Sequence, residues 1–213
     1  MDWFVANWTF VAGLGATHLS VSVIPILVGA FLAVMFARIT PSRWANTTRG
    51  VLGAIYAIPS LALFVTLPVL IGTDFTGPTN VVIALTIYVI ASMYFSAQDA
   101  FSQVPQPTVT NAESMGMNSR QVFFHVELPM AVPGLIAGLR VAAASTISIA
   151  SIGAVVGVRN LGYLFIDGFQ RKIPEEIITG ILAIFVIAIA LDACLWLVGR
   201  LLTRWRFVKV DHA

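Results

Sequence analysis

The chain has 213 residues, of which 58% are hydrophobic and 10% are charged, and its mean hydropathy is +0.91. Soluble domains carry about 45–50% apolar and roughly 25% charged residues, so this composition excludes a water-soluble globular domain and requires lipid as the solvent. The formal net charge is only +2, so the pI of about 9.0 gives no reason to expect nucleic acid as a partner.

The N-terminus differs from a secretory signal peptide. Its only charge before the first long apolar run is Asp2, whereas a signal peptide begins with a positively charged region. Trp3 and Trp8 are typical of side chains that anchor a segment at the membrane–water interface.

Transmembrane helices are predicted from apolar stretches of about 20 residues, the length that crosses the hydrocarbon core. Five stretches meet this requirement, at residues 19–37, 51–73, 78–98, 132–158 and 177–199. The only charges inside them are Arg140 and Asp192, both toward the cytoplasmic ends of their spans, where we expect structural roles and consider a mutual pairing. We therefore predict an all-α membrane protein, with one transmembrane domain over residues 1–213.

The positive charges orient these spans, because cytoplasmic loops carry an excess of Lys and Arg. Arg140 lies inside a span and does not count. If the N-terminus is outside, only Arg159, Arg171 and Lys172 lie on the external side. The other eight of the 12 basic residues are then cytoplasmic: Arg38, Arg43, Arg49, Arg120, Arg200, Arg204, Arg206 and Lys209. The sequence predicts an N-out/C-in topology.

Two further features concern packing. Gly134, Gly138 and Ala142 recur every four residues in the fourth span, which indicates a close helix contact, either within the subunit or in a dimer interface. Cys194 is the only cysteine, so no intrachain disulfide is available, and we expect a buried, inert thiol.

The polar segment 99–130 lies on the cytoplasmic side in this topology and is predicted to hold two short helices. Pro107 can open the first helix and Gly116 can end it, while Asn118 or Ser119 can cap the second. Val122, Phe123 and Val126 form an apolar stripe on the second helix. Arg120 is the only basic residue of the pair, so a groove in a protein partner fits this stripe better than a lipid surface.

The spacing of Gly116 and Leu128-Pro129 resembles that of the coupling loop in ABC-importer permeases. The resemblance is greatest to the osmoprotectant permeases for glycine betaine, carnitine and choline, and it runs from about His18 to Trp196. The matching pieces are Ile58-Pro59-Ser60-Leu61-Ala62-Leu63, Met115-Gly116-Met117, Val126-Glu127-Leu128-Pro129, Ala137-Gly138-Leu139-Arg140, Ile152-Gly153-Ala154 and Leu161-Gly162 with Phe165.

This resemblance implies a type I ABC importer permease fold in a bacterial plasma (inner) membrane. It implies that the chain is a non-catalytic translocation subunit: it holds no cofactor, catalytic residue or metal of its own, and ATP and Mg are bound and hydrolysed on a separate polypeptide. The sequence agrees, because it contains no GxxxxGK[ST] phosphate-binding motif. The implied partners are a second permease chain, two ATP-binding subunits and an extracytoplasmic substrate-binding protein.

The ATPase-coupling residues implied by the resemblance are Ala112, Gly116, Phe123, Phe124, Leu128 and Pro129. Phe123 and Phe124 are the candidates for apolar contact with the ATPase, and Gly116→Val or Phe123→Asp is expected to abolish ATP-coupled uptake while sparing membrane insertion. The family's Glu-Ala-Ala triplet falls here on Thr110-Asn111-Ala112, so only Ala112 matches. The missing glutamate leads to the hypothesis that this chain is the degenerate half of a heterodimeric pore.

Two other functions stay open at this stage. One is a permease of the same architecture for methionine or another amino acid. The other is an autonomous secondary transporter or channel, which would leave the long cytoplasmic segment without a purpose and would normally show more intramembrane carboxylates.

Overall fold

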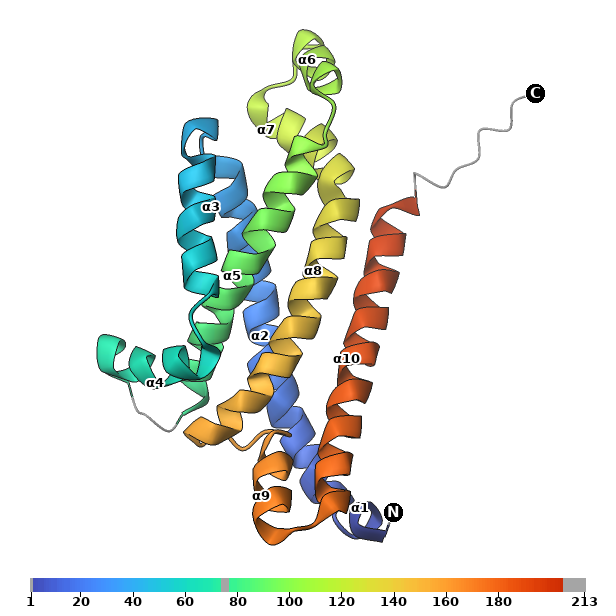
Figure 1. Cartoon of the computed structure of the whole chain (residues 1–213). Helices are drawn as coiled ribbons and strands as arrows, with labels where there is room; N and C mark the ends of the chain where they lie inside the picture. Colours follow the sequence, from blue (N-terminus) through green and yellow to red (C-terminus); the bar gives the residue numbers. More distant parts are fainter. Residues whose placement is uncertain (1, 74–76, 205–213) are drawn as a thin grey trace, which may run out of the picture.

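The computed structural model describes residues 2–73 and 77–204, and over these residues the secondary structure is helical, without β-strands (Figure 1). Arg206 and Lys209, two of the eight basic residues predicted to be cytoplasmic, lie outside the described residues. The helices are α1 (Asp2–Ala6), α2 (Trp8–Ile39), α3 (Ser42–Tyr56), α4 (Ser60–Ile71), α5 (Pro78–Ser102), α6 (Gln106–Ser114), α7 (Ser119–Val122), η1 (Phe123–Glu127), α8 (Leu128–Ala150), η2 (Ser151–Val156), α9 (Tyr163–Arg171) and α10 (Pro174–Leu202).

Four segments of the described chain are long and apolar enough to cross a membrane as continuous helices. They are α2, α5, the run Ser119–Val156 that includes α8, and α10. Each of these segments contains one of the stretches predicted from hydropathy, except that the last two residues of 132–158 lie beyond Val156. Helix α2 begins 11 residues before its predicted stretch. Gly77 caps α5 and Pro78 is its first residue, because proline fixes a helical φ where no N–H partner is needed.

The sequence predicts one transmembrane helix over residues 51–73, but this stretch is not one straight helix in the structure. It is divided between α3 and α4, which are bent by 98° at the break (Figure 1). Pro59 causes the break, since it disfavours a helical conformation at Ile58 and lacks an N–H to continue the hydrogen-bond ladder. The hydroxyl of Tyr88 on α5 donates to the carbonyl of Ile58, which would otherwise be left without a helical partner. The described chain thus has five spans only if the bent pair is counted as one.

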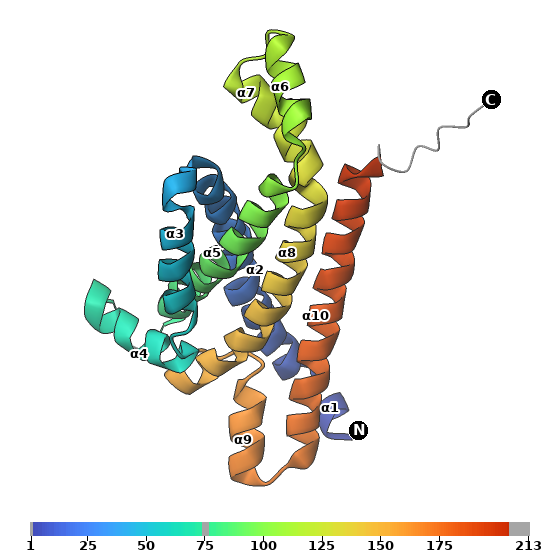
Figure 2. The same ribbon diagram turned by 45° about the horizontal axis from the view of Figure 1, so that its top comes forward.

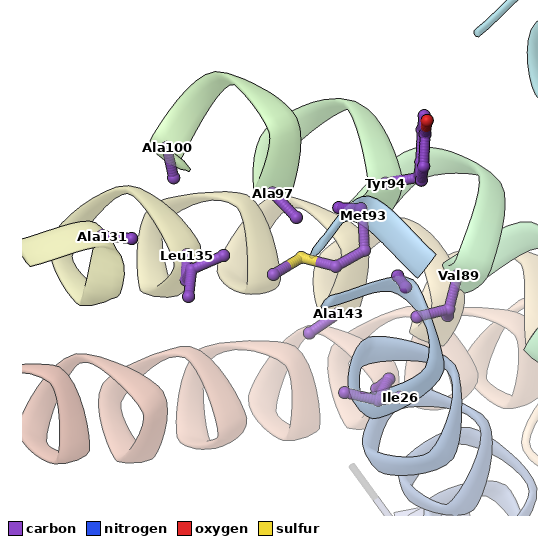
Figure 3. Packing of buried hydrophobic residues seen from close by; sticks show 11 residues of the cluster. Ile26, Val89, Met93, Tyr94, Ala97, Ala100, Ala131, Leu135 and Ala143 are labelled. Carbon is purple, nitrogen blue, oxygen red and sulfur yellow. The ribbon is translucent and has the colours of Figure 1, made fainter. Parts of the chain in front are cut away.

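Helix α5 forms the centre of the bundle, between α2 and α8 (Figures 1 and 2). Its apolar side chains meet those of both neighbours in one continuous cluster (Figure 3). The labelled members are Ile26 from α2, Val89, Met93, Tyr94, Ala97 and Ala100 from α5, and Ala131, Leu135 and Ala143 from α8.

The small residues of the fourth predicted span make the α5–α8 contact close. A Cβ added to Gly134 would lie 2.8 Å from the Cβ of Ala100, and one added to Gly138 would overlap Ser96. Ala142 is 3% exposed. Of the two interpretations of this stripe, the structure therefore supports packing within the subunit.

Helix α10 lies at the edge of the bundle and presents apolar side chains outward. Phe185 and Val186 are more than 60% exposed, which fits a surface solvated by lipid. The prediction that Cys194 is buried was wrong: it lies on this outward surface, because an apolar run in a membrane helix does not distinguish core from lipid.

Candidate functional site

The segment 99–130 forms two short helices beyond the ends of the long helices, at one end of the molecule (Figures 1 and 2). Pro107 lies in the first turn of α6, and Asn118 caps α7 as predicted. The cap is reciprocal: the Gln121 N–H donates to Asn118 Oδ1 at 3.0 Å, and the Asn118 N–H donates to Gln121 Oε1 at 2.9 Å. Gly116 connects the helices with φ +89°, a conformation that favours glycine.

The helix pair has a small apolar core of its own. Val109 and Ala112 of α6 pack against Val122 of α7, and Val104, Met117 and Val126 surround them. Ala112, the one residue that matches the family triplet, is 7% exposed and faces this core. It therefore supports the shape of the loop from inside, while the neighbouring Thr110 and Asn111 are exposed.

The chain returns to the membrane through a widened turn. Over η1 the backbone is π-helical, and the Leu128 N–H donates to the carbonyl of Phe123, five residues earlier. Pro129 explains the widening, because it has no N–H to donate and its ring would clash with the carbonyl four residues before it. Leu128-Pro129 thus determines the geometry at which the loop joins α8, and π turns of this kind occur frequently at functional sites.

The structure separates the two adjacent phenylalanines. Phe123 is 8% exposed, with its ring centroid 6.0 Å from that of Phe101 on α5, whereas Phe124 is 60% exposed. Successive residues of a helix point about 100° apart, so only one of the two can face the bundle. Of the two side chains assigned to partner contact from the sequence, Phe124 is available and Phe123 is occupied within the subunit.

Two arginines, which the sequence had identified only as topological charges, contact the two ends of the segment. Arg49 of α3 donates to Gln98 Oε1 at 2.7 Å and to Asp99 Oδ1 at 2.6 Å, near the end of α5. Nε of Arg38 on α2 lies 3.1 Å from Oε2 of Glu127, which is the last residue of η1.

Inside the spans, Arg140 and Asp192 form the pair considered from the sequence. The guanidinium donates from Nε to Asp192 Oδ1 at 2.6 Å and from Nη2 to Oδ2 at 2.7 Å. The two side chains are 38% and 42% exposed on the surface of the subunit. This bidentate arrangement joins α8 to α10 and leaves neither charge alone in an apolar environment.

We expect Asp192→Ala to lower the yield of folded protein severalfold, because Arg140 would then remain unpaired in a span. The double variant Arg140→Leu/Asp192→Leu removes both charges and is expected to recover most of the yield. The measurement is the monodisperse fraction of a fluorescent fusion in mild detergent. Equal losses in the single and double variants would contradict a pairing role.

At the opposite end of the bundle, Asn160 forms a buried contact that the sequence did not reveal. Its Nδ2 donates to the Ala150 carbonyl at 2.7 Å, and its Oδ1 accepts from the Gly162 N–H at 2.8 Å. Nearby on α8, the Ile147 carbonyl lies 3.1 Å from Nε2 of the fully buried His18. These polar contacts tie the turn after η2 to α8, and α8 to α2.

Comparison with known proteins gives the family. Residues 25–208 match the family described as "Binding-protein-dependent transport system inner membrane component". The osmoprotectant import permease protein OsmW of Salmonella typhimurium is 33% identical over 182 residues, which cover 83% of this chain and 80% of OsmW. The choline transport system permease protein OpuBB of Bacillus subtilis is 28% identical, covering 87% of this chain and 85% of OpuBB.

Two further similarities are more limited in what they show. EgtU of Helicobacter pylori, an ergothioneine transport permease/ergothioneine binding protein, is 30% identical over 142 residues, but this chain spans only 25% of its length. The MetNI methionine ABC transporter, solved in an inward-facing conformation, superposes with a TM-score of 0.72 at 18% identity and covers 91% of this chain and 94% of that one. This likeness shows the fold alone. With a family match over most of its length, the chain belongs to the binding-protein-dependent inner-membrane components and is the permease of an ABC importer.

Proposed function

We propose that this permease translocates osmoprotectants carrying a trimethylammonium group, such as glycine betaine, carnitine or choline, into the bacterial cytoplasm. The observation that carries the proposal is similarity over most of the chain to permeases named for these solutes. Methionine fits less well, since the likeness to MetNI is one of fold at 18% identity. A secondary carrier or channel would have no use for the folded helix pair α6–α7.

The topology that fits this function has five spans, with α3 and α4 together forming the second. The N-terminus is outside and the C-terminus inside, in the plasma (inner) membrane. Support comes from Arg38, Arg43 and Arg200, which lie at the α6–α7 end of α2, α3 and α10 (Figure 1). Further support comes from Arg171, the last residue of α9, and Lys172, which caps it, at the other end.

In this proposal, the α6–α7 pair docks into a separate ATPase, where ATP and Mg are bound. The exposed side chains near the loop turn, Met115 and Phe124, supply apolar contact, while Ala112, Gly116, Phe123, Leu128 and Pro129 hold the loop in shape. Two ATP-binding subunits serve two permease chains, and a substrate-binding protein docks on the outer side. Because Thr110-Asn111 replaces the first two residues of the family triplet, we favour a heterodimer with a second, different permease.

The expected result is ATP-dependent uptake of at least one trimethylammonium solute. The permease, copurified with its ATPase and partner chain, is reconstituted into proteoliposomes with its binding protein and assayed with labelled glycine betaine, carnitine, choline, ergothioneine and methionine, with and without ATP on the cytoplasmic side. Uptake of methionine alone would move the function to the amino-acid alternative. ATP-independent uptake would indicate a secondary carrier, and a complex active with only this permease chain would rule out the heterodimer.

A further inference from the structure

The segment 99–130 is held at both ends by one helical hairpin. Arg49 reaches its beginning, and Arg38 reaches its end. These arginines lie on the two arms of the hairpin formed by α2 and α3, which are joined by Thr40 and Pro41 alone. The two ends of the loop, separated by about 30 residues of sequence, thus meet the same pair of helices.

At the beginning of the loop, the contact continues into the core. Arg49 binds the carboxylate of Asp99 and the amide oxygen of Gln98, and the amide nitrogen of Gln98 donates to the hydroxyl of Tyr94 at 2.7 Å. Tyr94 is fully buried in the central cluster of Figure 3. A displacement of this end of α5 would therefore be transmitted to α3 through these hydrogen bonds.

At the end of the loop, Arg38 contacts two residues of the π turn. Its Nε lies 3.1 Å from Glu127 Oε2, and its guanidinium carbon lies 5.4 Å from the centroid of the Phe123 ring. Phe123 in turn packs against Phe101 of α5 and against Phe124, with a centroid distance of 5.0 Å to the latter. The exposed ring of Phe124 is thus connected to α2 through one buried ring and one cation–π contact.

The two ion pairs differ in how exposed they are. The side chains of the Arg38–Glu127 pair are 41% and 20% exposed, and those of the Arg49–Asp99 pair are 39% and 60% exposed. The accessible Arg49–Asp99 pair contributes little to stability, whereas the Glu127 oxygen that faces Arg38 is buried. Both nevertheless occur at the points where the loop meets the spans, so they fit a role in transmitting movement.

We propose that the α2–α3 hairpin follows the movement of the 99–130 loop through Arg38 and Arg49, which act as positioning residues for transport. The bend after α3 then carries this movement into α4. The inference rests on the proposed docking of α6–α7 to an ATPase, and it does not depend on which solute is carried.

The first test compares uptake per ATP hydrolysed in the reconstituted complex. For Arg38→Ala/Arg49→Ala we expect ATP hydrolysis to stay close to wild type and uptake per ATP to fall at least about fivefold, the lower range of typical coupling between sites. The control is Arg43→Ala, which removes an exposed arginine of the same hairpin that forms no ion pair within residues 2–73 and 77–204. The exchange Arg38→Glu/Glu127→Arg should restore part of the loss. A purely structural role would lower hydrolysis and uptake together, and an unchanged ratio would overturn the proposal.

A second readout needs no transported solute. Spin labels are placed at Thr108→Cys on the loop and Trp44→Cys on α3, both exposed and neither assigned to ATPase contact, in a Cys194→Ser background. We expect the label distance to be the same in the nucleotide-free and vanadate-trapped complex, and to change on trapping only in Arg38→Ala/Arg49→Ala. A change in the otherwise wild-type protein, or none in the double variant, would overturn the proposal. Failure of the proposed function is recognised separately, because no ATPase would then copurify with the wild-type chain.

Discussion

Gly162→Ala is expected to prevent the protein from reaching a stable folded state. A Cβ at this position would lie 2.7 Å from the carbonyl carbon of Ser151, 2.9 Å from its Cα, and closer still to its oxygen. These are backbone atoms, so no side-chain rotation relieves the overlap, and α9 would have to move away from η2.

That movement would break the hydrogen bonds of Asn160. Gly162 donates its N–H to Asn160, and Asn160 is held by the carbonyl of Ala150, with all three groups buried. Unmade buried hydrogen bonds cost about 1–3 kcal/mol each, so overpacking and lost bonds together are expected to destabilise the protein by about 3 kcal/mol or more. The measurement is the apparent melting temperature and monodisperse yield in mild detergent.

The matched control for this substitution is Gly50→Ala. Gly50 lies within α3, where an added Cβ meets nothing within 4 Å. Alanine is favoured over glycine in a helix interior by roughly 1 kcal/mol, so the control is expected to melt at the wild-type temperature or slightly above it. If both variants melted alike, the close approach of Gly162 to Ser151 would be without consequence for stability.

Features that depend on a few neighbouring residues could be predicted from the sequence. Hydropathy located the long helices because about 20 apolar residues have no other stable place than a membrane. Pro107 and Asn118 indicated the two short helices, since each has a local backbone reason to begin a helix. Pro59 is the same kind of local signal for the 98° bend, but the uninterrupted apolar run around it is equally typical of a single span.

Features that depend on how helices face one another could not be predicted. The contacts of Arg38 with Glu127 and of Arg49 with Asp99 join residues 89 and 50 positions apart, and each arginine on its own indicated only topology. Phe123 and Phe124 are chemically identical, so the orientation of η1 alone decides which ring is buried. The two short helices of segment 99–130 were thus predicted correctly, and their role in coupling stays a prediction, while the division of its residues between internal support and exposed surface required the structure.

Gly116→Val is expected to abolish ATP-coupled uptake while leaving membrane insertion intact. Gly116 has φ +89°, and an added Cβ meets nothing within 4 Å, so the effect comes from backbone conformation rather than from lack of space. A left-handed conformation costs an L-residue about 1–2 kcal/mol, and a β-branched residue is the least tolerant of it. The loop can avoid this strain only by rotating α7 away from α6, against the small core around Val109 and Val122.

Because 1.4 kcal/mol is a factor of ten in an equilibrium, we expect uptake to fall at least about tenfold in Gly116→Val. Gly116→Asn should retain more activity, since asparagine accepts a positive φ more readily. Both variants should insert normally because the residue lies outside the spans. Wild-type uptake in Gly116→Val, or equal loss in both variants, would show that the conformation of this turn is not what the ATPase requires.

The sequence indicated Phe123→Asp as the second test of the loop, but the structure makes Phe124→Asp the better substitution. Phe123→Asp would place a carboxylate in the contact with Phe101 and near Glu127, so lost uptake could follow from a damaged subunit rather than from a lost docking contact. Phe124→Asp leaves that packing in place and changes a ring that is 60% exposed. We expect Phe124→Asp to preserve the folded yield and to reduce copurification of the ATPase, whereas Phe123→Asp lowers both. If Phe124→Asp retained the ATPase as well as wild type does, the docking surface would have to lie on another face of α6–α7.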